Sequence, residues 1–331
     1  MPQTRYFFEG SHEQFPPSDL LQQAVEAERA GFDAVGCSDH FQPWWPGGES
    51  GHAWVWLGAA AQATERVPVG TGVTTLVHRF HPAIVAQAFM TLEEMFPGRV
   101  FLGIGSGESL NETPLGHPWP PVKEQLEMMA EGLEIITRLW DGERFSYRGR
   151  HFGLDDAVLH THPGRRPPVY VSAFGPQAAR IAGRFGDGLW TLGDPDSAPE
   201  IIDAYRAAAE EAGREPGEIV LHTGMSWAET EEEALEGARM WKGTQIPDYF
   251  RDDWHVPEEM DRRAQEEVSD EAFREGFIIT ADVDAHIERI REIEELGADI
   301  VSLQCIGPDP HGTIRTYGES VLPALRGAAV S

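Results

Sequence analysis

The chain has 331 residues, of which 41% are hydrophobic and 24% are charged, the proportions of an ordinary soluble globular protein. Its 55 acidic and 26 basic residues give a formal net charge of −29, which argues against nucleic acid as a partner, because such binding depends on clusters of lysine and arginine. No apolar stretch approaches the roughly 18 residues that a membrane span requires, so we expect no membrane association.

From the N-terminus onward, short apolar runs alternate with amphipathic helical stretches. The opening MPQTRYFFEG has neither a basic leader nor an apolar run ending in a cleavage site, so we expect a cytoplasmic protein. Helices are predicted at 17–30 and 122–140 by the spacing of apolar residues. Strands are predicted at residues 5–8, 34–38, 67–75, 100–105, 168–173, 188–192, 219–227 and 300–306. Eight nearly continuous apolar strands, each followed by a helix, predict an α/β fold of the (β/α)8 TIM-barrel type.

Two stretches depart from this alternation, and we expect both to be insertions in a single domain that spans residues 1–331. A β-hairpin is predicted near 141–154, and a mostly helical, acidic insertion near 229–280. Barrels carry their functional groups at the carboxyl ends of the strands, so the second insertion is a candidate substrate cover. Cys37 and Cys305 lie in predicted strands without metal-ligand spacing, which indicates inert core thiols and no metal site.

The loop after the second strand brings ionisable and aromatic side chains together. Asp39, His40 and Trp44 stand within seven residues of one another in SDHFQPW. A histidine that titrates near neutrality beside an orienting carboxylate is suited to general acid or base catalysis. A structural histidine is the alternative for any single position, but the strand-end location and the indole favour a catalytic one.

Glycine-rich turns follow three other strands. GTGVTT at 70–75 would let a flat ring lie against the backbone, and GIGSGESLNE at 103–112 carries Glu108 and Asn111. The second turn lacks the G-x-G-x-x-G spacing and the ribose-binding acid of a nicotinamide site, so nicotinamide binding is rejected. The turn at 174–180 enters a helix whose free amides can hold an anion without a positive side chain, although an ordinary strand-to-helix turn would look the same.

In this spacing, four segments resemble the glucose-6-phosphate dehydrogenases that depend on coenzyme F420, a family of the bacterial luciferase-like superfamily. The segments are EQF at 13–15, SDHFQPW at 38–44, FLGIGSGESLNE at 101–112 and PVYVSAFGP at 168–176. The resemblance extends from residue 6 to 325 and is weakest between about 193 and 280. It implies an oxidoreductase that exchanges a hydride between the deazaflavin F420 and an alcohol or carbonyl group of a small molecule, and it implies a homodimer.

The resemblance also implies a role for individual residues. His40 would act on the substrate hydroxyl proton, Glu108 would be the second catalytic acid or base, and Glu13 and Trp44 would complete the catalytic group. A non-proline cis peptide is implied between Gly72 and Val73. The positions implied to bind the cofactor are Asp39, Gly72, Val73, Thr75, Asn111, Phe174, Gly175, Ala178 and Ala179. Those implied to contact substrate are Trp44, Thr191 and Arg262.

The chain departs from that family where a sugar phosphate should bind. Asp194 and Asp196 stand where a phosphate-binding lysine is expected, and Gly276 replaces an arginine. Two carboxylates beside a dianion are unfavourable, so we expect a neutral alcohol, sugar or ketone as substrate. The cations left to rebuild an anion site are Arg262, Arg263, Arg274 and Lys242.

Three alternatives stay open at this point. The enzyme could be an F420-dependent sugar-6-phosphate dehydrogenase, an FMN-dependent luciferase-like monooxygenase, or a catalytically silent barrel. The joint presence of Asp39, His40 and Glu108 argues against the silent barrel. The direction of the reaction, oxidation or reduction, is also left open.

Overall fold

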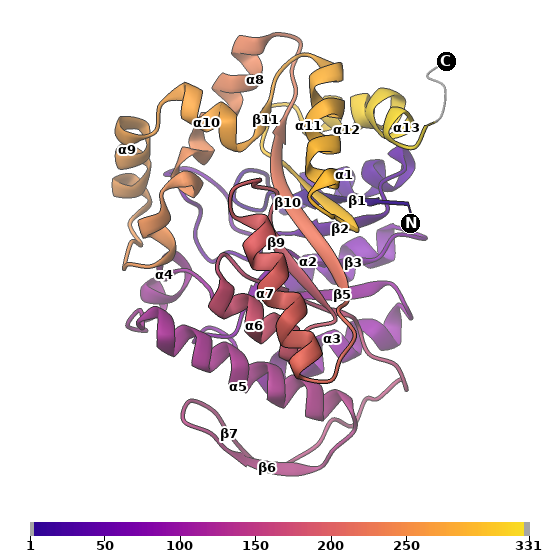
Figure 1. Ribbon diagram of the computed structural model, residues 1–331, viewed down its shortest axis with the longest axis vertical. Coiled ribbons are helices and arrows are strands. Elements are labelled where there is room, and N and C mark those ends of the chain that lie inside the picture. The colour runs from indigo at the N-terminus through magenta and orange to yellow at the C-terminus, as the bar shows by residue number, and fades with distance from the viewer. Residues whose placement is uncertain (1–2, 328–331) are drawn as a thin grey trace.

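Eight parallel strands form the inner layer of the computed structural model, which describes residues 3–327 (Figure 1). They are β1 (Arg5–Gly10), β2 (Ala34–Cys37), β3 (Val69–Thr71), β5 (Val100–Gly105), β8 (Val169–Ser172), β9 (Gly188–Leu192), β10 (Glu218–Ser226) and β12 (Ile300–Cys305). Each strand pairs with the next, β9 pairs with β10, and β12 pairs with β1, so the sheet closes into a barrel. The predicted (β/α)8 class is confirmed.

Helices cover the outside of the barrel (Figure 1). They are α1 (Pro17–Ala30), α2 (Ala53–Ala63), α3 (Pro82–Met95), α5 (Val122–Trp140), α6 (Pro176–Phe185), α7 (Ala198–Glu211), α11 (Val283–Glu295), α12 (Pro310–Thr316) and α13 (Leu322–Leu325). The sequence explains why they pack there. In α5, for example, Met129, Leu133 and Ile136 recur at intervals of three or four residues and are fully buried against the sheet.

Large side chains fill the lower part of the barrel. Phe7, Phe101, Tyr170 and Trp190 come from four strands and form one interior cluster. The barrel is therefore a packed core rather than a pore, and a ligand can bind only beyond the carboxyl ends of its strands.

The third predicted strand, 67–75, is interrupted. β3 ends at Thr71, a cis peptide joins Gly72 to Val73, and the chain resumes as β4 (Thr74–Thr75) beside β5. The cis peptide that the resemblance implied is confirmed. Gly103 contributes to this geometry, because a Cβ there would overlap the Thr71 carbonyl oxygen.

Two segments lie outside the repeating units. The hairpin of β6 (Phe145–Arg148) and β7 (Gly153–Ala157) lies below α5 in Figure 1, where Glu131 of α5 accepts hydrogen bonds from the backbone N–H groups of Arg150, His151 and Phe152. The second segment contains α8 (Glu231–Ala238), η2 (Arg239–Gln245), η3 (Pro247–Phe250), α9 (Pro257–Glu267) and α10 (Asp270–Gly276), and the short β11 (Ile278–Ile279) follows it.

The helical segment is attached to the loops at the carboxyl ends of three strands. Trp241 Nε1 donates to Gln14, and Gln42 Nε2 donates to the His255 carbonyl at 3.1 Å. Ser109, in α4 (Ser109–Glu112) after β5, accepts from the Trp254 N–H at 2.8 Å. Because every anchor lies at the same end, this segment covers the functional end of the barrel. Among the described residues, no helix has the length and hydropathy needed to cross a bilayer.

Candidate active site

His40 lies in the loop after β2, at the carboxyl ends of the barrel strands. Its Nε2 atom lies 3.3 Å from Glu13 Oε1 and 3.5 Å from Glu108 Oε2. These residues come from the loops after β2, β1 and β5, so the closed barrel brings together side chains that are far apart in the sequence. Nδ1 lies 3.3 Å from the Gln42 carbonyl oxygen, which can only accept. Nδ1 also lies 3.3 Å from Asn111 Nδ2, which can only donate, so these two neighbours favour opposite tautomers. In the tautomer in which Nδ1 donates to the carbonyl, Nε2 has a free lone pair and can take up a proton.

The two carboxyl groups beside His40 have different surroundings. Glu13 is buried and accepts a hydrogen bond from the Ser38 hydroxyl, which in turn accepts from the His12 N–H. Glu108 lacks such a partner among hydroxyl groups, and removal from water, together with the nearby charge of Glu13, raises its pKa above the usual range. This shift favours the protonated form of Glu108, in which the carboxyl group can donate a proton.

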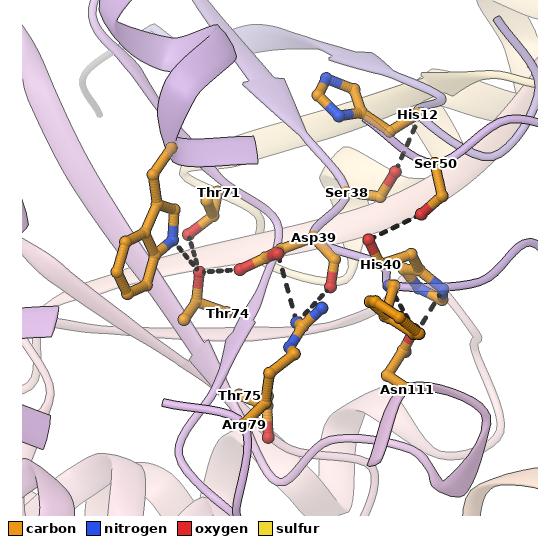
Figure 2. Close-up of polar contacts among 12 residues, drawn as sticks. His12, Ser38, Asp39, His40, Ser50, Thr71, Thr74, Thr75, Arg79 and Asn111 are labelled. Atoms are coloured by element: carbon orange, nitrogen blue, oxygen red, sulfur yellow. Dashed lines mark hydrogen bonds and ion pairs between the residues drawn. The ribbon is translucent and has the colours of Figure 1, made fainter. Parts of the chain in front are cut away.

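Asn111 holds the His40 loop in place (Figure 2). Its Oδ1 accepts from the N–H groups of Phe41 at 2.7 Å and Gln42 at 3.3 Å, while Nδ2 lies 3.3 Å from both His40 Nδ1 and Glu108 Oε2. One amide thus ties the loop after β2 to the loop after β5.

Asp39 points away from His40 into a separate network, as Figure 2 shows. Thr74 Oγ1 donates to Asp39 Oδ2 at 2.6 Å, and the buried Arg79 guanidinium lies 3.2 Å from Oδ1. Arg79 also donates to the Asp39 carbonyl at 2.6 Å. Asp39 therefore fixes β4 and the following loop against β2, rather than orienting the imidazole directly.

The indole of Trp44 is buried beside His40, with ring centroids 5.9 Å apart. On its other side it contacts Phe250 and Tyr249 of η3, at centroid distances of 5.5 and 6.3 Å. The helical segment thus contributes directly to the surroundings of His40.

Of the positions implied to bind the cofactor, Phe174 is exposed and Gly72, Val73, Gly175 and Ala178 are partly exposed, whereas Asp39, Thr75, Asn111 and Ala179 are buried. Gly175 is the N-cap of α6, and a Cβ added there would meet nothing within 4 Å. Pro176 follows without an N–H group, so the free amides at this helix start are those of Gln177 and Ala178. Gly107 has φ +79°, and a Cβ there would overlap Thr75 Oγ1. A flat ring against Gly72 and Val73 with an anionic tail at α6 fits this arrangement.

Two implied substrate residues do not join the group around His40. Thr191 of β9 is on the same strand face as Leu189, which packs in the outer core, because alternate residues of a strand point to opposite faces. Arg262 lies on α9 with its side chain 67% exposed and pairs with Glu266 of the same helix. No group of three His, Cys, Asp or Glu residues within 3–327 is placed to hold a metal ion.

Glu9 is a buried carboxyl group that our sequence analysis did not identify. It is fully buried in β1, neither oxygen has a hydrogen-bond partner, and it fits only because Gly36 and Gly72 lack side chains. Burial and the nearby charge of Glu13 raise its pKa well above the usual range, which favours the protonated form. A charged residue at an inward position of an apolar strand was the available signal, but the predicted strand ended at residue 8.

Glu112 was missed for a similar reason. Burial raises its pKa to about 7, although the charge of Arg79 and the backbone N–H groups of Arg79 and His78 oppose the shift. The sequence shows Glu112 at the end of a polar turn, which gives no indication that α4 buries it.

The barrel carries a histidine and two carboxyl groups at the carboxyl ends of its strands, where enzymes of this fold have their active sites. The chain belongs to the luciferase-like monooxygenase family, whose model matches residues 3–299.

Among its relatives are F420-dependent glucose-6-phosphate dehydrogenases of Microbacterium testaceum and Beutenbergia cavernae. They are 39% and 40% identical to this chain, and each alignment covers 97% of both sequences. A solved F420-dependent secondary alcohol dehydrogenase, in complex with an F420-acetone adduct, is 35% identical with a TM-score of 0.94, covering 98% of this chain and 99% of that one. An F420-dependent tetrahydromethanopterin reductase of Methanopyrus kandleri, 21% identical with a TM-score of 0.80, shares the fold.

Proposed function

We propose that this protein is an F420-dependent oxidoreductase that transfers a hydride between the deazaflavin and an alcohol or carbonyl carbon. The observation that carries the proposal is the position of His40 Nε2 between Glu13 and Glu108, at the carboxyl ends of the strands of a barrel that also contains the Gly72–Val73 cis peptide. F420-dependent dehydrogenases that are similar to this chain over its whole length support the proposal.

The positions implied to bind the cofactor suit F420. Gly72, Val73, Thr75 and the glycine of the β8–α6 turn would hold the ring and the start of the tail, and the tail anion would lie at the N–H groups of α6. The further positions proposed to bind it are Asp39, Asn111, Phe174, Ala178 and Ala179. When bound, F420 supplies or accepts the hydride at a ring carbon.

The proton is handled by the chain's own side chains. In the oxidation direction, His40 Nε2 would accept the hydroxyl proton of the substrate. Glu13, whose Oε1 lies 3.3 Å from Nε2, would stabilise the imidazolium that forms. Glu108, whose raised pKa favours the protonated form, would donate a proton toward charge that develops on the cofactor side. Trp44 would restrict the substrate to the space above His40.

We propose a neutral substrate, because the cations of the helical segment are already paired. Lys242 contacts Asp270 at 2.8 Å, Arg263 bonds to Asp248 and Glu267 at 3.0 and 2.9 Å, and Arg274 bonds to Glu231 at 3.0 Å. The Asp194 carboxylate is engaged locally, where it accepts from the Asp196 N–H at 3.1 Å and from the Ser197 hydroxyl at 2.6 Å. The secondary alcohol dehydrogenase, solved with an F420-acetone adduct, is the relative whose substrate class agrees with this proposal.

The two other functions predict different results. A sugar-6-phosphate dehydrogenase would need one of these ion pairs to open so that a cation could bind the phosphate. The similarity to F420-dependent glucose-6-phosphate dehydrogenases favours this alternative. An FMN-dependent monooxygenase would bind FMN and consume oxygen.

Fluorescence titration of the purified protein tests the cofactor. We expect saturable binding of F420 with a dissociation constant in the micromolar range or below, and no binding of NADP, because the chain lacks a dinucleotide fingerprint. FMN serves as the third ligand of the same titration. Saturable binding of NADP or FMN without a response to F420 would overturn the proposal.

We also propose that the protein works in the cytoplasm as a homodimer. The two cysteines, Cys37 and Cys305, are free and fully buried, which suits a reducing compartment. The dimer rests on the resemblance alone, and light scattering of the purified protein measures it.

A further inference from the structure

A row of aromatic rings leads from His40 to the surface of the protein. Trp44 lies 5.9 Å from His40, Phe250 lies 5.5 Å from Trp44, and Phe174 lies 5.6 Å from Phe250, measured between ring centroids. The three rings come from the β2 loop, from η3 and from the β8–α6 turn. Phe174 is 54% exposed, so the row ends at solvent.

Polar groups near this row are already engaged. Gln42 Nε2 donates to the His255 carbonyl, and the Thr244 hydroxyl donates to the Trp241 carbonyl. Arg263 is held by two carboxylates and lies over the rings of Tyr249 and Trp254, at 5.4 and 4.8 Å. The described side chains next to the row therefore offer apolar ring surface, with few free hydrogen-bonding groups for a sugar.

We propose that the substrate is a neutral secondary alcohol or ketone with a flat apolar substituent, such as an aryl group. Its reacting carbon would lie at His40, and its substituent would lie against the partly exposed ring of Phe250 and the exposed ring of Phe174, since the Trp44 ring is only 3% exposed. Aromatic groups pack favourably at ring distances of about 4.5–7 Å in tilted or edge-to-face arrangements. The existing pairs, at 53° and 84° between ring planes, show that the row already uses these arrangements.

This inference rests on the proposed F420-dependent activity, and a matched set of alcohols separates the two. With F420 as acceptor, kcat/KM would be measured for propan-2-ol, 1-phenylethanol, 1-cyclohexylethanol and glucose. We expect 1-phenylethanol to be the best substrate, exceeding propan-2-ol by about tenfold or more, since burying an aryl group adds apolar and ring contacts. If none of the alcohols or glucose is oxidised, the proposed function itself fails. If propan-2-ol or glucose equals or exceeds 1-phenylethanol, only the present inference fails.

Variants of Phe250 test whether the row is responsible. Phe250→Ala should lower kcat/KM for 1-phenylethanol about tenfold and change it less than about twofold for propan-2-ol, and Phe250→Leu should lie between. Phe152→Ala, which truncates a phenyl group on the hairpin, should change neither value. F420 affinity and the thermal midpoint would be measured for each variant. Equal losses for both alcohols, or a matching loss of F420 affinity in Phe250→Leu, would assign the ring to structure or cofactor binding and overturn the inference.

Discussion

His40 lies between two carboxyl groups that differ because of their surroundings. Glu13 accepts a hydrogen bond from Ser38, whereas burial raises the pKa of Glu108. A carboxylate that can stabilise a charged histidine thus lies beside a carboxyl group whose raised pKa favours proton donation.

Replacement of His40 tests its assignment. His40→Ala should lower turnover by on the order of 100-fold or more while F420 affinity stays within about twofold, because the lost group acts on the substrate proton. Steady-state kinetics and fluorescence titration measure the two effects. Glu108→Gln should also impair turnover, since the amide cannot donate the acid's proton. Turnover like that of the wild type in the His40 variant would require another base.

Glu9 gives a prediction about stability and pH. Its folded-state pKa is raised, so above pH 4.5 the unfolded chain releases a proton that the folded chain retains. Each pH unit between the unfolded and folded pKa values therefore lowers the free energy of unfolding by roughly 1.4 kcal/mol. Glu9→Gln lacks this penalty, and its thermal midpoint should rise relative to the wild type between pH 5 and pH 7.

The comparison needs calorimetry or fluorescence-monitored melting of both proteins at pH 5, 6 and 7. Glu112→Gln is a useful second variant, because the pKa of Glu112 is about 7 and its advantage should level off near that pH. A midpoint difference for Glu9→Gln that stays constant with pH would mean that Glu9 is ionised in the folded protein.

At the scale of elements, the turn between β5 and α4 sets the position of Glu108. Gly107 precedes Glu108 in the left-handed region, at φ +79°, and is packed against Thr75. Gly116 has a similar φ of +87° but open space around it. Substitutions at these two glycines therefore distinguish the effect of backbone strain, which both positions share, from the effect of close packing, which only Gly107 has.

Gly107→Ala should lower turnover by between tenfold and 100-fold, because displacing a catalytic group by about 1 Å has effects of that size. Gly116→Ala should share only the conformational cost of about 1–2 kcal/mol and keep near-normal turnover. Kinetics and melting of both variants measure this. Equal losses of turnover would show that the packing against Thr75 does not position Glu108.

At the scale of the whole molecule, the net charge of −29 acts on any anionic substrate that approaches. The paired state of the cations in the helical segment leaves this repulsion uncompensated. We therefore expect charge to disfavour an anionic substrate independently of the shape of the pocket.

We expect glucose 6-phosphate to be a poor substrate compared with neutral alcohols. Its kcat/KM should rise when salt is added, because screening weakens repulsion, while that of a neutral alcohol should change little. Steady-state kinetics from low to moderate ionic strength check this. A high value for glucose 6-phosphate that falls with salt would show that the arginines or Lys242 form an anion site, and the substrate claim would fail while the cofactor claim survived.

The sequence alone was enough to predict the barrel, because its strands are nearly continuous apolar runs and its helices carry regular apolar stripes. The predicted ranges 17–30, 100–105, 122–140 and 188–192 agree with α1, β5, α5 and β9. Strand-end loops could also be ranked, since a parallel barrel places the carboxyl ends of its strands together. His40, Trp44 and Glu108 emerged in this way.

Only the tertiary structure decided which side chains meet. Burial and partners depend on contacts between distant segments. The buried Glu9 without a hydrogen-bond partner, the link between Asp39 and Arg79, and the pairing of Lys242 with Asp270 therefore could not be predicted from sequence spacing. The ring row that ends at Phe174 likewise joins three separate segments. Local patterns determine the elements because hydrogen bonding and side-chain alternation are local, whereas the electrostatics of the site depend on packing between segments that are distant along the chain.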